Sequence, residues 1–229
     1  IQAGAFVTNT SSGAESVTVK VGPTLTPVST FTQGPVFIDG GDRDDHGSFS
    51  AGANQNGWKF IQQAVQFVRT GSFNPGTIKD VLIIGANGST ASAAIGSALS
   101  VLGYSSDTVT AVGPGAMQIG GVNFGNYKLI YVPSNEESPF NNTPGGITNP
   151  QLAALNARKA DIQAYVKTGG GIVALTEQDS VGAYGWLELP LPFVTFPNFE
   201  TVMVQDPNLA AAGFSITNAE LSAGTPSHN

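Results

Sequence analysis

The residues best suited to chemistry lie in one short loop, Asp39-Gly40-Gly41-Asp42-Arg43-Asp44-Asp45-His46-Gly47. Four carboxylates fall within seven residues of it, those of Asp39, Asp42, Asp44 and Asp45. Carboxylates this close repel one another unless a cation or a proton neutralises them. Calcium suits such a loop, because it binds six to eight oxygens and tolerates irregular geometry. The loop is not an EF-hand, since the Glu at position twelve is absent. The sequence therefore predicts an irregular calcium site.

Two other interpretations of this loop stay open. It can be a solvated acidic turn with Arg43 as its internal counterion, or one carboxylate can be catalytic. His46 and His228 are the only histidines in the chain. If both reached Asp42 and Asp45, they would form a hydrolytic or metal-binding constellation. The sequence equally fits two unrelated surface histidines.

The elements that must position this loop alternate between strands and helices. A short apolar run over 36–38 ends in the acidic loop, and the helical spacing of apolar residues begins at Trp58. Further strands are expected at 81–84, 107–112, 129–132 and 172–175, and helices at 58–68, 89–102 and 149–167. Continuous apolar strands between helices predict an α/β fold with a doubly wound, mostly parallel sheet.

The carboxyl ends of parallel strands share one edge of the sheet, where doubly wound folds bind ligands. The sequence places a possible ligand cleft there, made of His46, Glu136, Glu137, Thr176, Glu177 and His228. Trp58 and Trp186 either form a sugar-stacking platform or pack into the core. The turn at 85–89 lacks the full G-x-G-x-x-G spacing and is interpreted as the start of a helix.

Residues 1–34 are expected to form a separate N-terminal β-hairpin arm and linker, and residues 35–229 the α/β domain. The arm's strands are expected at 6–8 and 16–21, where polar and apolar residues alternate. Two strands alone are marginally stable, so the arm must pack on the main domain or on another molecule.

The composition excludes several classes of partner. The net charge is −7 with nine Lys and Arg, so no basic field attracts nucleic acid or an anionic membrane. The sequence contains no run of 18 apolar residues and therefore predicts no membrane span. Cysteine is absent, which removes disulfides and thiolate chemistry. Charged residues make up only 11% of the chain, a balance common in exported proteins.

Residues 80–178 resemble the class I glutamine amidotransferase-like superfamily, which has a flavodoxin-like fold. The matching segments are 80–84, 127–134 and 162–175, the last running from a helix through Gly169-Gly170-Gly171 into a strand. In catalytic members a nucleophilic cysteine follows the strand that corresponds to 172–175. Thr176 and Glu177 stand there instead, which implies a degenerate, non-catalytic member. The wider pattern resembles uncharacterised exported bacterial surface proteins.

Together these features predict an extracellular, non-enzymatic surface or matrix protein, calcium-stiffened and self-assembling into a fibre or layer. Its partners would be copies of itself, other surface proteins or glycans. One alternative is a secreted hydrolase that acts on sugars or esters through carboxylates and a histidine at the sheet's carboxyl edge. Another is a carbohydrate-binding module.

Overall fold

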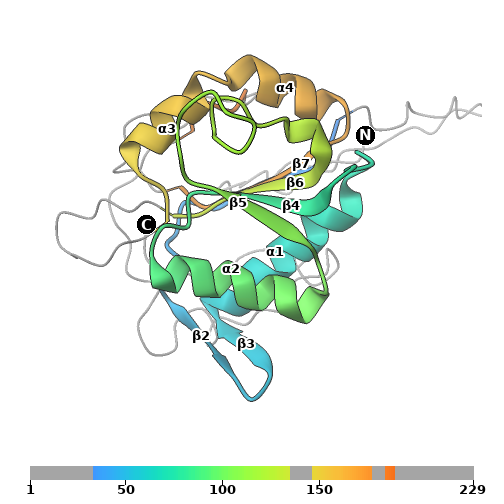
Figure 1. Cartoon of the computed structure of the whole chain (residues 1–229). Coiled ribbons are helices and arrows are strands. Elements are labelled where there is room, and N and C mark those ends of the chain that lie inside the picture. Colours follow the sequence, from blue (N-terminus) through green and yellow to red (C-terminus); the bar gives the residue numbers. More distant parts are fainter. Residues whose placement is uncertain (1–32, 135–145, 177–183, 189–229) are drawn as a thin grey trace, which may run out of the picture. The chain divides into compact units, whose positions relative to one another are not determined.

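The computed structural model describes residues 33–134, 146–176 and 184–188 (Figure 1). Their main element is a parallel five-stranded sheet in the order β1-β7-β6-β4-β5. The strands are β1 Val36–Ile38, β4 Lys79–Ile84, β5 Ser106–Val109, β6 Tyr127–Val132 and β7 Gly171–Ala174. The predicted α/β fold with a parallel sheet is confirmed.

Helices cover both faces of this sheet (Figure 1). Helix α1 Gly57–Gly71 and helix α2 Ser89–Leu102 lie on one face. Helix α3 Asn149–Asn156 and helix α4 Lys159–Lys167 lie on the other. A 3₁₀ turn, η1 Phe124–Asn126, leads into β6. The sheet is therefore doubly wound, as predicted.

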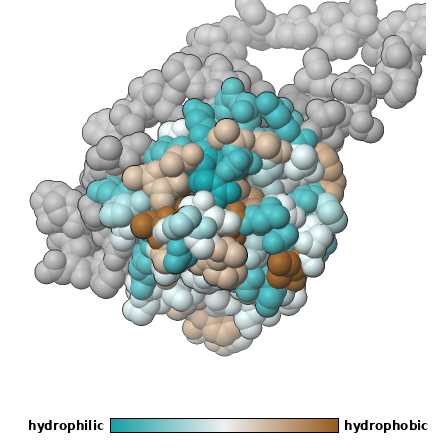
Figure 2. Space-filling model, turned by 45° about the horizontal axis from the view of Figure 1, so that its top comes forward, coloured by the Kyte–Doolittle hydropathy of each residue, from teal (hydrophilic) through white to brown (hydrophobic). Residues whose placement is uncertain are grey.

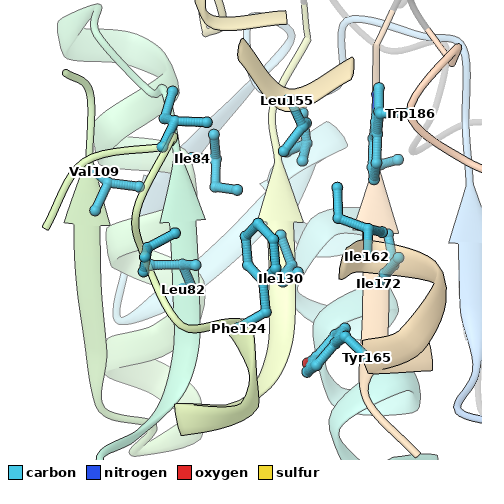
Figure 3. Close-up of a cluster of buried hydrophobic side chains, with 14 of the residues drawn as sticks. Leu82, Ile84, Val109, Phe124, Ile130, Leu155, Ile162, Tyr165, Ile172 and Trp186 are labelled. Carbon is cyan, nitrogen blue, oxygen red and sulfur yellow. The ribbon is translucent and has the colours of Figure 1, made fainter. Parts of the chain in front are cut away.

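Each face of the sheet has its own apolar core, because alternate residues of a strand point to opposite faces. Val81 and Ile83 of β4 pack with the α1–α2 side, whereas Leu82 and Ile84 pack with the α3–α4 side. Figure 3 shows the second core, where Leu155, Ile162 and Trp186 cover the strands. Both cores are well filled: the buried β4 side chains are at most 5% exposed.

The chain reverses direction across the sheet between β4 and β6. Strand β4 continues through α2 to β5 on one side, and β6 continues through α3 and α4 to β7 on the other. A crevice outside the carboxyl ends of two such strands is where open α/β sheets bind ligands. The site must therefore be sought beyond Ile84 and Val132, next to the loop that follows β1.

The prediction of a single helix over 149–167 is wrong, because the structure has two helices there, separated by Ala157 and Arg158. Arg158 leaves helical geometry and donates to the carbonyls of Ile119 and Val122, at 2.8 and 3.0 Å. Its guanidinium also lies 4.5 Å from the centre of the Phe124 ring. Through these contacts, Arg158 links the loop before β6 to the α3–α4 layer.

A short antiparallel hairpin, β2 Gly47–Ser50 and β3 Ala53–Asn56, was not expected from the sequence. Its turn is formed by Ala51 and Gly52, both at positive φ, which suits the twist of a two-residue hairpin. The hairpin projects from the α1–α2 side (Figure 1). The hairpin predicted at 6–21 lies outside the described residues.

The surface of the α3–α4 side mixes polar and apolar residues. Figure 2 turns this side forward, and the apolar residues there are separated by hydrophilic ones. Among the described residues, no helix is long and apolar enough to cross a membrane.

Candidate functional site

The acidic loop begins with an ion pair directly after β1. Arg43 Nε lies 2.7 Å from Asp39 Oδ2, and the guanidinium is stacked 5.4 Å from the centre of the Phe60 ring. Gly41 makes room for it, because a Cβ there would lie 2.9 Å from Arg43 Cζ. Arg43 is therefore the internal counterion of Asp39, as one interpretation of the sequence had it. The loop is not the solvated turn of that interpretation, because Asp42, Arg43 and Asp44 are buried.

The second pair joins Asp42 and His46. His46 Nε2 lies 2.8 Å from Asp42 Oδ2, and both side chains are largely buried. The hydrogen bond to Asp42 raises the pKa of His46 above its usual value, although burial opposes this. A histidine held by a carboxylate is a common general-base arrangement.

Asp44 points into the protein and is fully buried. Its Oδ2 accepts a 3.2 Å hydrogen bond from the backbone N–H of Ser134, and its backbone carbonyl accepts one from Trp58 Nε1 at 2.8 Å. Burial raises the pKa of Asp44 to about 6, with a smaller contribution from the nearby charge of Asp45 and partial compensation by hydrogen bonds from Ser134. Asp44 thereby ties the loop to the end of β6 and the start of α1.

One oxygen of Asp44 and the hydroxyl of Tyr131 are both buried without a hydrogen-bond partner in the described part of the chain. Burial, together with the nearby Asp44 carboxylate, raises the pKa of Tyr131 well above its usual value. An unpaired buried oxygen costs free energy, and protonation lowers that cost for a carboxylate. The burial of these two oxygens without partners therefore favours the neutral form of Asp44.

The structure directs the candidate calcium ligands to different partners. Asp39 contacts Arg43, Asp42 contacts His46, and Asp44 contacts Ser134. Asp45 is half-buried beside them. Within the described ranges, no group of three or more acidic, histidine or cysteine side chains could hold a metal ion. Calcium binding by this loop stays a prediction.

Hydrogen bonds within the protein cross the space beyond the carboxyl ends of β4 and β6, where Asn87 is exposed and Gln151 is buried. The amides of Asn87 and Gln151 bond each other in both directions, at 2.8 and 3.0 Å. Asn87 Nδ2 also donates to the carbonyl of Gly146 at 2.8 Å. Gly85, at φ 88°, is needed here because a Cβ would lie 2.8 Å from the same carbonyl oxygen. The turn at 85–89 therefore starts α2 and packs against residues 146–151.

Thr176, which the sequence resemblance placed at the nucleophile position, lies two residues beyond β7. Thr176 is fully buried, as is the neighbouring Leu175. Four other cleft candidates, Glu136, Glu137, Glu177 and His228, lie outside the described residues. The structure therefore places His46 and Thr176 of the expected cleft, and both are enclosed to a large degree.

The two tryptophans pack into the protein. Trp58 is 8% exposed and Trp186 is fully buried, so neither ring presents a stacking face. Tyr184 donates to the carbonyl of Asp39 at 2.9 Å. The alternative in which both tryptophans pack into the core is confirmed.

Four residues at this edge escaped the sequence reasoning: Tyr131, Ser134, Asn87 and Gln151. Ser134 stands two residues past β6, so the rule that polar groups gather at carboxyl ends could have found it. Gln151 carried a different signal, since it forms a capping box with Thr148 at the start of α3. Its contact with Asn87 joins distant segments and had no local signal.

Comparison of the chain with models of protein families, with curated proteins and with solved structures gave no significant match.

Proposed function

We propose that this chain is an extracellular, non-enzymatic surface or matrix protein that self-associates and uses its α/β domain as a scaffold. The domain is, in this proposal, a degenerate member of the amidotransferase-like superfamily. Four of its strands support this: β5-β4-β6-β7 follow the first four places of the flavodoxin-like order 2-1-3-4-5, whereas the fifth place is taken by β1, which comes first in the chain.

The observation that carries the proposal is the enclosure of the carboxyl edge. Thr176, at the nucleophile position, is fully buried. Asp44 is buried against Ser134, and the Asn87–Gln151 amide pair joins the segments that follow β4 and β6. In the described part of this edge, the polar groups that could act on a substrate serve internal contacts instead.

Self-association is proposed to run through the N-terminal arm, residues 1–34. Its alternating residues at 16–21 suit addition to a sheet edge. Strand β1 is an edge of the described sheet, where it pairs with β7 on one side. A strand from a neighbouring molecule beside an edge of this kind would link copies head to tail and build a fibre or layer.

The test is the assembly state of the full chain, measured by light scattering and negative-stain microscopy. Fibres, sheets or large regular oligomers that disappear when residues 1–30 are deleted are the expected result. Calcium and a chelator are compared in parallel to test the predicted stiffening. A full chain that stays monomeric at high concentration, or a truncated chain that assembles as well as the full one, would contradict the proposal.

A second candidate, a hydrolase, is favoured by one observation: the Asp42–His46 pair lies beside Asp44, whose pKa of about 6 suits a general acid. A panel of ester and glycoside substrates tests it. Turnover that His46→Ala removes, while the variant keeps the wild-type circular dichroism, would favour the hydrolase over the scaffold. Turnover equal in both proteins would come from a contaminant and count against it.

A further inference from the structure

The chain contains two Asn-Gly pairs, Asn56-Gly57 and Asn87-Gly88. In such pairs the backbone nitrogen of Gly can attack the side-chain carbonyl carbon of Asn and form a five-membered cyclic imide. Gly permits this most readily, because it has no side chain to hinder the approach. Whether ring closure occurs in a folded protein depends on the backbone angle ψ of the Asn, which sets the distance between the two reacting atoms.

Asn56 has φ 53° and ψ −130°, a conformation that residues other than glycine rarely adopt. Because the substituents on Cα are about 120° apart, a ψ near −120° eclipses Cβ with the next backbone nitrogen. Ring closure requires that eclipsed arrangement. In a helix (ψ about −42°) or a strand (ψ about +135°), Cβ is rotated far out of the plane of the following peptide.

We infer that Asn56 is a site of spontaneous deamidation in the native protein, with its backbone already set for attack by the Gly57 nitrogen. The Gly57 N–Asn56 Cγ bond forms, the Cγ–Nδ2 bond breaks, and ammonia leaves with the proton from the Gly57 N–H. Water from the solvent then opens the imide. Cleavage of the new N–Cγ bond gives aspartate, and cleavage of the original peptide bond gives isoaspartate.

The surroundings of Asn56 bear on both steps. The residue stands between β3 and α1 and is half-buried, so water can reach the imide. The Gly57 N–H donates to the carbonyl of His46 at 3.0 Å, and this hydrogen bond breaks when the nitrogen attacks. An aspartate at this N-cap position places a negative charge at the positive end of α1, which is favourable. Isoaspartate instead lengthens the backbone between β3 and α1.

The second pair is a matched control within the same chain. The side-chain amide of Asn87 is held by Gln151 at both its oxygen and its nitrogen, and the nitrogen also donates to Gly146. Asn87 is not among the described residues with positive φ, which besides glycines are Ala51, Asn56 and Ala86. The dipeptide sequence is therefore identical, whereas the backbone conformation differs.

The experiment measures deamidation at both sites by tryptic digestion and mass spectrometry, after the full chain has been incubated in mildly alkaline buffer. Synthetic peptides of residues 44–59 and 80–95, incubated in the same buffer, give the rates without the fold. We expect Asn56 to react about tenfold faster in the protein than in its peptide, since about 1.4 kcal/mol of conformational strain is then already present before the reaction. Asn87 should react more slowly in the protein than in its peptide.

Two variants show which asparagine gives rise to the deamidated peptide. Asn56→Gly fits the same backbone conformation and should remove the modified 44–59 peptide. Asn87→Gly should leave that peptide unchanged. An isoaspartate-specific methyl-transfer assay on intact protein gives a second readout, which should fall with Asn56→Gly. If folding slows Asn56 as it slows Asn87, the inference is overturned.

Discussion

His46 and Asp42 are paired within the acidic loop, with His46 Nε2 2.8 Å from Asp42 Oδ2 and both side chains largely buried. The pairing raises the pKa of His46 above 6.5. Such a group stabilises the fold fully below its unfolded pKa, and the contribution is lost as the pH rises through the folded pKa.

This pairing predicts a pH-dependent effect of Asp42→Asn. We expect the variant to lower the free energy of unfolding by about 1–2 kcal/mol near pH 5.5, and by less near pH 8.5, because the charged pair weakens as the rising pH removes the proton of His46. Urea denaturation at both pH values measures this. Asp161→Asn is the control, because the Asp161 side chain is 60% exposed and its pair with Arg158 contributes little. A loss of equal size at both pH values would contradict the prediction.

Asp44 predicts a second pH effect with the same sign. The pKa of the Asp44 carboxyl is about 6 in the fold, against 3.8 for an aspartate without neighbours. The folded state therefore binds the proton more tightly than the unfolded state does. Stability should therefore rise as the pH falls from about 7.5 to about 5. Asp44→Asn mimics the neutral acid and should remove a large part of this slope, on the order of 2 kcal/mol. Carboxyl-carbon NMR of wild type gives the direct check: an Asp44 midpoint near 4 would refute it.

Arg158 predicts a local effect on the loop before β6. It donates to Ile119 and Val122 and lies over the Phe124 ring. Arg158→Ala should destabilise the fold by about 2–3 kcal/mol, because two buried carbonyls lose a charged donor. Hydrogen exchange should rise at the Val122 amide. Arg158→Lys keeps the charge and not the planar fork, so it should restore less than half of the loss.

Two glycines predict opposite outcomes of the same substitution. A Cβ at Gly96 in α2 would meet no atom within 4 Å, so Gly96→Ala should stabilise the protein by about 0.5–1 kcal/mol. A Cβ at Gly170 would lie 2.1 Å from the Tyr165 ring, so Gly170→Ala should destabilise it by about 1–3 kcal/mol. Thermal melts compare the two. Equal shifts would show that packing at Gly170 is looser than described.

Much of the fold could be predicted because its signals are local. Helix α2 was expected at 89–102 with Gly103 closing it, and the structure ends it there, with Gly103 at φ 68°. Apolar runs placed the inner strands for the same reason. The hairpin β2–β3 was missed, since its strands are short and carry Ser, Asn and Gln rather than β-branched residues. The break at Arg158 was missed because its partners are far along the chain.

The site was harder to predict, because spacing shows which residues are near in sequence and not where their side chains point. The aspartates of the acidic loop were correctly placed at the sheet's carboxyl edge. Their contacts depend on Ser134, which follows β6, and on Trp58 of α1, which only the fold brings to them. A run of carboxylates read from sequence suggests a cation, whereas burial and hydrogen bonds divide these among Arg43, His46 and a backbone amide.

The place of β1 beside β7 has a consequence for how the molecule is made. The first described strand pairs with the last, Val36 opposite Ile172, so this edge of the sheet cannot form until the four other strands have been synthesised. The intervening strands can assemble earlier, since β4 and β5 are joined through a single helix. Residues 36–38 must therefore remain without their β7 partners until residues 171–174 have been synthesised. Pairing of β1 with β7 is therefore the step that completes the described sheet.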